Sequence, residues 1–109
     1  MKRYTLALDL INEQALIREY EAYHQAVWPE IQDSIKGSGI IAMEIYRFDN
    51  RLFMLMDVND DFSFERKNEL DAANEKVQEW ETLMWKYQQA LPGAKEGEKW
   101  VLMHKIFEL

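Results

Sequence analysis

The chain has 109 residues, of which 48% are hydrophobic and 30% are charged, and its formal net charge at pH 7 is −7. This length and composition predict one globular domain spanning residues 1–109. The acidic balance argues against nucleic acid as a partner, because phosphate binding depends on clustered Lys and Arg. The absence of cysteine excludes disulfides and thiolate metal sites.

The amino terminus does not resemble a secretion signal, because its short apolar run is interrupted by Asp9. No stretch reaches the roughly 18 consecutive apolar residues of a membrane span. We therefore expect a cytoplasmic protein with no membrane contact.

The first predicted element is a strand over residues 3–10, where apolar side chains alternate. Asn12 is expected to cap the helical segment that follows. That segment, residues 16–35, has one face made largely of apolar side chains. The face carries Leu16, Tyr20, His24, Val27, Trp28, Ile31 and Ile35. The Tyr20 hydroxyl and the His24 imidazole are the polar groups on this face, and when buried they need hydrogen-bond partners from the protein or from a ligand.

Pro29 predicts a break in this segment, because proline has no amide hydrogen and disfavours helical geometry at the residue before it. The chain should restart with Pro29 in the first turn and end at Gly37. A break beside His24 and Trp28 would direct their rings toward a cleft. The alternative is a core histidine beside core aromatic residues.

The remaining elements alternate between strands and helices. Residues 40–48 and 52–58 are predicted strands of a hairpin, with Ile41, Met43 and Ile45 facing one way. A short helix to about residue 70 and a loop over 71–75 follow. Apolar spacing predicts a helix over residues 77–91, ended by Pro92 and Gly93, and a last strand over residues 99–109.

The order β, α, β, β, α, β predicts an α+β fold of the ferredoxin-like βαββαβ type, with helices on one face of an antiparallel sheet. Because the strands are apolar on both sides, the uncovered face would leave a large apolar patch, and such patches mark interfaces. A symmetric homodimer with sheet packed against sheet, a dimeric αβ-barrel, would cover it.

His24 is the best candidate for an acid or base, because imidazole is the side chain that ordinarily titrates nearest neutrality. His104 is the only other histidine, and the spacing of the two predicts no metal site. No phosphate-binding loop or serine-nucleophile motif is present. We therefore expect proton transfer on a small neutral ligand without a cofactor, or no chemistry. The tryptophans suit a sugar ring, although each alone is better explained as core.

The chain resembles the L-rhamnose mutarotase family of small dimeric ferredoxin-like proteins that interconvert the α and β anomers of deoxysugars. The shared residues span most of the chain, and the Tyr, His, Trp-Pro-Glu spacing is the specific part. They are Glu19, Tyr20, His24, Trp28, Pro29, Glu30, Lys36, Gly37, Ile45, Tyr46, Leu52, Phe53, Trp80 and Met84.

The resemblance implies that His24 is the proton donor, Tyr20 a substrate-binding phenol and Trp80 a wall of the sugar pocket. We also expect Trp28 to bind the substrate, because the break at Pro29 would direct its ring toward a cleft. Two pocket positions depart from the rhamnose enzymes. Met43 stands where they have a tyrosine, and Glu81 where they have a second tryptophan. The sugar is therefore open between L-rhamnose and L-fucose, which close relatives use.

Two other functions are compatible with this scaffold, because one fold can carry many activities. The first is a dimeric αβ-barrel module that binds a small ligand without turnover. The second is a haem-handling dimer in which a histidine ligates iron.

Overall fold

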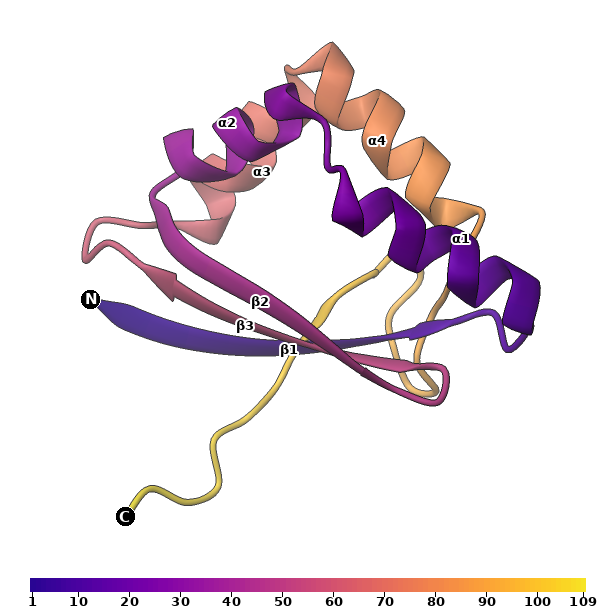
Figure 1. The fold of residues 1–109 in the computed structure, drawn as a ribbon. Coiled ribbons are helices and arrows are strands. Elements are labelled where there is room, and N and C mark those ends of the chain that lie inside the picture. Colours follow the sequence, from indigo (N-terminus) through magenta and orange to yellow (C-terminus); the bar gives the residue numbers. More distant parts are fainter.

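All the helices lie on one face of a single antiparallel sheet (Figure 1). A computed structural model describes residues 1–109. The predicted ferredoxin-like α+β fold is confirmed. The elements in chain order are β1 (Lys2–Leu10), α1 (Gln14–Gln25), α2 (Pro29–Gly37), β2 (Ile40–Phe48), β3 (Arg51–Val58), α3 (Phe64–Ala72), α4 (Glu75–Trp85), β4 (Gln88–Gln89) and β5 (Val101–Leu102).

The sheet has the order β2-β3-β1-β4, and β5 also pairs with β1. β3 is the central partner, since it pairs along its length with both β1 and β2. On the other edge of β1, β4 lies opposite Asp9 and Leu10, while β5 lies opposite Leu6 and Ala7. Together these two short strands occupy the place of the fourth strand of the fold.

The predicted break at Pro29 is confirmed. α1 ends at Gln25, and α2 begins with Pro29 at its first position, where the missing amide hydrogen is not needed. The predicted cap at Asn12 is wrong. The extended residue before α1 is Glu13, and its side chain makes no capping hydrogen bond.

The helix, loop and strand predicted after residue 70 differ in length from the observed elements. The helix predicted over residues 77–91 ends at Trp85, because Tyr87 accepts a hydrogen bond from the Ile11 amide and β4 then pairs with β1. The loop predicted over 71–75 is shorter than expected, because α3 reaches Ala72 and α4 begins at Glu75, which leaves only Ala73 and Asn74 between the helices. Of the strand predicted over 99–109, only β5 forms. The residues after Met103 leave the sheet (Figure 1).

The predicted pattern of β2 is wrong at Ile41, because the strand contains a β-bulge there. Ile40 lies opposite Val58 while Ala42 lies opposite Asp57, so Ile41 is the extra residue. Ile41 is therefore 56% exposed instead of facing the helices with Met43 and Ile45. The bulge turns Ile40 inward, where it is buried.

The core consists of two separate clusters of buried side chains beneath the helices. One contains Leu10, Ile17, Tyr20, Leu52, Met84 and Tyr87. The other contains Leu6, Ile40, Met54, Met56 and Val58. Ile45 and Trp100 pack against both clusters. A domain of this size usually has one contiguous core, so the division calls for an explanation.

Gly39, at the turn from α2 into β2, has a φ of +99°, which residues with a Cβ rarely adopt. We expect Gly39→Ala to lower the free energy of unfolding by about 1–2 kcal/mol through backbone strain. The nearest side chains lie 3.7 Å from an added Cβ, an ordinary contact, so crowding adds little. Urea denaturation measures the effect.

The control is Gly37→Ala at the end of α2, where nothing lies within 4 Å of an added Cβ and φ is not positive. This variant should be neutral or slightly more stable. Equal destabilisation by both substitutions would contradict the assignment of strain to Gly39.

Candidate active site

A cavity of about 880 Å³ lies between the two halves of the core. It touches Tyr20 and Met84 of one cluster and Leu6, Met54 and Met56 of the other. Its volume lies within the range of about 300–1,000 Å³ that is usual for small-molecule sites. The division of the core therefore has a simple explanation, which is that it leaves room for a ligand.

His24 lies at the edge of this cavity, in the last turn of α1. Its Nδ1 lies 2.8 Å from the carbonyl oxygen of Tyr20. The carbonyl can only accept a hydrogen bond, so Nδ1 carries a hydrogen and donates it. Nε2 has no partner in the protein and is free to accept or return a proton. His24 is neither sealed into the core nor saturated with hydrogen bonds.

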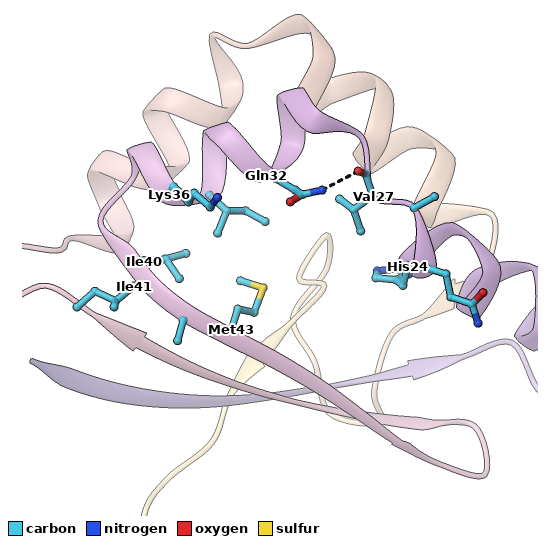
Figure 2. A pocket seen from close by; sticks show the side chains of 11 residues that line it. His24, Val27, Gln32, Lys36, Ile40, Ile41 and Met43 are labelled. Atoms are coloured by element: carbon cyan, nitrogen blue, oxygen red, sulfur yellow. Dashed lines mark hydrogen bonds between the residues drawn. The ribbon is translucent and has the colours of Figure 1, made fainter.

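A second, shallower hollow of about 400 Å³ adjoins the first and also has His24 in its wall. Figure 2 shows His24 and Met43 facing this space, from the end of α1 and from β2 respectively. Gln32 of α2 donates a hydrogen bond of 2.9 Å to the Val27 carbonyl, which braces the segment between the two helices. His24 is therefore accessible from both hollows.

Tyr20 is one turn before His24 and is only 3% exposed, yet it borders the cavity. The two rings lie with their centroids 4.4 Å apart. Burial raises the pKa of the Tyr20 phenol, and a hydrogen bond from Gln88 partly opposes this. Tyr20 is thus a neutral phenol at pH 7 and can donate its hydrogen.

Trp80 of α4 forms an aromatic wall of the cavity, and the centroids of its ring and of the His24 ring are 5.7 Å apart. Trp28 does not line the cavity. It packs edge-on against Trp80, with the ring centroids 5.1 Å apart, from the residue just before α2. Of the residues predicted at the site, all but Trp28 border the cavity, and Trp28 supports one that does.

Met43 and Glu81, the two predicted departures, both border the cavity. Lys99 donates a hydrogen bond of 3.3 Å from Nζ to the backbone carbonyl oxygen of Glu81. The same Nζ lies over the Trp85 ring, 4.7 Å from its centroid. Partial burial lowers the pKa of Lys99, while the nearby Glu81 carboxylate raises it. Two oppositely charged residues, Glu81 and Lys99, therefore line the cavity at the position where, by the resemblance, the rhamnose enzymes have a second tryptophan.

Several polar residues that line the cavity were not predicted from the sequence. Lys67 and Asp71 form an ion pair on α3, and both border the cavity. Their spacing of four residues was visible in the sequence, but only the fold turns that helix face inward. Gln88 was missed because the predicted helix continued through it.

The structure contains no group of three His, Cys, Asp or Glu side chains arranged to hold a metal ion. None of its helices combines the length and apolar character that crossing a membrane would require.

Residues 3–109 match the family model described as L-rhamnose mutarotase. The chain belongs to the L-rhamnose mutarotase family. It is a sugar mutarotase, an isomerase that interconverts the anomers of a deoxysugar, as the resemblance implied.

Two relatives extend over the same residues. The chain is 44% identical to an L-fucose mutarotase of Xanthomonas campestris pv. campestris, covering 100% of this chain and 89% of the relative. It is 36% identical to a UPF0734 protein of Dictyostelium discoideum, covering 99% and 90%.

Among solved structures, the fold is similar to an L-rhamnose mutarotase of Formosa agariphila, with a TM-score of 0.74, 22% identity and coverage of 100% and 99% of the two chains. It is also similar to the tetracenomycin F2 cyclase of Streptomyces glaucescens, with a TM-score of 0.64, 15% identity and coverage of 100% and 97%. At these identities the likeness concerns the fold alone.

The positions of the two tryptophans predict different effects in this mutarotase. Trp80→Leu removes a cavity wall and should raise the KM for L-fucose or L-rhamnose roughly tenfold, the upper range for an aromatic contact. Trp28→Leu should change KM less than threefold, because Trp28 contacts only the back of that wall. Anomer-exchange kinetics at several sugar concentrations measure both, and equal effects would contradict the assignment.

Proposed function

We propose that this protein interconverts the α and β anomers of L-fucose, with His24 as the proton-transfer group. The single observation that carries the role of His24 is its hydrogen bonding. Nδ1 is held by the Tyr20 carbonyl at 2.8 Å, and Nε2 is unpartnered at the edge of a cavity. Family membership favours this enzyme over the two alternatives of a ligand-binding module and a haem-handling dimer.

The reaction needs only proton transfer. In ring opening, the anomeric hydroxyl loses a proton, the bond between C1 and the ring oxygen breaks, and the ring oxygen gains a proton. The product is an open aldehyde with a free hydroxyl. Rotation about the bond next to C1 and closure on the other face reverse these steps, so atoms and protons balance. One positioned acid-base group contributes roughly 10² to 10⁴ in rate.

His24 and Tyr20 are suited to these steps through different atoms. Nε2 of His24 can take up a proton and return it, because Nδ1 keeps its hydrogen on the Tyr20 carbonyl. The Tyr20 phenol, kept neutral by burial, can donate a hydrogen bond to a sugar oxygen. Trp80 provides a flat apolar surface for the sugar ring, with Trp28 behind it.

Two reasons lead us to infer L-fucose, and not L-rhamnose, as the substrate. The first is the 44% identity to an L-fucose mutarotase over the whole chain. The second is the altered cavity wall, in which Met43 and Glu81 stand where the resemblance leads us to expect aromatic residues. The two sugars differ in the orientation of their ring hydroxyls, so a changed pattern of polar wall residues fits a changed sugar.

Saturation-transfer NMR on the anomeric protons of L-fucose and L-rhamnose tests this function. The unaltered protein should accelerate exchange, and more so for L-fucose. His24→Ala should reduce the catalysed rate by about 10² or more, since the acid-base group is lost. Tyr20→Phe should reduce it less.

The matched control is His104→Ala, because His104 is the other histidine and lies exposed in the C-terminal segment. This variant should exchange anomers at the unaltered rate. Equal exchange of both sugars with and without protein would refute the assigned reaction, and a larger loss in His104→Ala than in His24→Ala would refute the assigned residue.

The expected homodimer also stays a proposal, and the sheet face away from the helices supports it. Its centre, on β1 and β3, holds Thr5, Ala7, Phe53 and Leu55. At either end of this centre an arginine and an aspartate pair across the two strands. An apolar centre with a charged rim is the usual anatomy of an interface.

The end of β2 and the C-terminal segment add further exposed apolar side chains. Phe48 at the end of β2 is 86% exposed, and Ile106, Phe107 and Leu109 are exposed beyond β5. A second copy of the chain would cover such side chains. The cytoplasmic location, like the dimer, remains a proposal from the sequence.

We expect the protein to elute with the mass of a dimer in size-exclusion chromatography with light scattering. Phe53→Glu places a charge in the centre of the open face and should give a folded monomer by circular dichroism, because burying an unpaired charge opposes association. Leu70→Glu alters an exposed leucine on α3 and should leave the dimer intact. A monomeric unaltered protein would contradict the proposal.

A further inference from the structure

Gln88 is a buried polar residue that the mechanism above does not use. It is 7% exposed and borders the large cavity. In β4 it lies opposite Leu10 of β1, whose side chain is fully buried under the helices. Directly opposed residues of an antiparallel pair point to the same face, so the Gln88 side chain extends toward the helices and the cavity.

The two ends of the Gln88 amide differ in their hydrogen bonding. Nε2 donates to the Tyr20 hydroxyl over 3.4 Å, a long contact. Oε1 is buried and has no hydrogen-bond partner in the protein, and it is the only such side-chain atom in the structure. Buried polar atoms are nearly always paired, because an unpaired one loses its hydration without compensation.

A leucine or methionine would fill this position without that cost. The surrounding core is apolar, with Met84, Leu10 and Leu52 in the same cluster as Tyr20. An unpaired amide beside this apolar cluster, at the edge of a cavity, is therefore better explained by a ligand than by packing.

Gln88 and Tyr20 together present a donor and an acceptor. When Nε2 donates to the Tyr20 oxygen, the phenol hydrogen is free to be donated elsewhere, and Oε1 is free to accept. A sugar hydroxyl both donates and accepts, so it can satisfy the two groups at once. Neither group carries a charge, which suits a neutral ligand.

We propose that Gln88 is a specificity-determining residue whose amide hydrogen-bonds one ring hydroxyl of the sugar, in concert with the Tyr20 phenol. This proposal rests on the proposed function, since it assumes a deoxyhexose in the same cavity. Gln88 contacts the sugar away from the atoms that exchange protons, so its contribution falls mainly on binding. It selects for sugars that place a hydroxyl at that point.

The test compares L-fucose with its 2-, 3- and 4-deoxy analogues, each of which lacks one ring hydroxyl. Anomer exchange is measured by NMR for the unaltered protein, for Gln88→Met and for Gln89→Met. Methionine keeps the length of the side chain and removes the amide. Gln89 is the matched control, because it is the next residue of β4 and is exposed.

Gln88→Met should raise the KM for L-fucose about tenfold while kcat changes less than threefold, in line with the loss of a neutral hydrogen bond. For one deoxy analogue, which lacks the hydroxyl that Gln88 binds, the substitution should leave KM unchanged. For the other two analogues it should raise KM by the same factor as for L-fucose. The melting temperature should stay equal or rise, because an unpaired buried group is removed. Gln89→Met should match the unaltered protein throughout.

The proposal is overturned if Gln88→Met leaves KM unchanged, or if it weakens all four sugars equally and lowers the melting temperature, as a structural glutamine would. If the unaltered protein does not accelerate exchange at all, the proposed function fails instead. Affinities of the same four sugars, from saturation-transfer difference spectra, then decide separately whether Gln88 recognises a hydroxyl.

Discussion

The missing amide hydrogen of Pro29 is the constraint on which the rest of the structure depends. Because proline cannot continue the hydrogen-bond ladder of α1, the helix ends at Gln25 and α2 begins on a new axis. The two helices then lie toward opposite ends of the sheet (Figure 1). Each helix covers its own part of the core, and both contribute residues to the wall of the cavity. The same break places His24 in a last helical turn, beside that cavity.

The cavity combines apolar walls with a few polar groups that come from separate elements. α1 supplies His24 and Tyr20, α3 the ion pair, and α4 Trp80 and Glu81. β4 supplies Gln88. Such a composition suits a small neutral ligand, whose orientation is set by hydrogen bonds and whose ring packs on apolar surface. Proton transfer by one imidazole, oriented by a backbone carbonyl, is sufficient chemistry for opening a sugar ring.

The two faces of the sheet are suited to different tasks. The face under the helices forms the core and the floor of the cavity. The opposite face has an apolar centre flanked by arginine-aspartate pairs, in which Arg3 lowers the pKa of Asp57 and so favours the charged pair. This division follows from alternation along β1 and β3, since every second side chain points to the other face.

The sequence by itself determined the fold class, the break at Pro29 and the inward placement of Tyr20 and His24, because local periodicity and proline geometry act over a few residues. Only the tertiary structure decided where α4 ends, because pairing of Gln88 and Gln89 with β1 outweighs their helical spacing. It also decided that Ile41 is displaced by a bulge, that Trp28 stands behind Trp80, and that Gln88 borders the cavity. These features depend on partners distant in the chain, which no local pattern specifies.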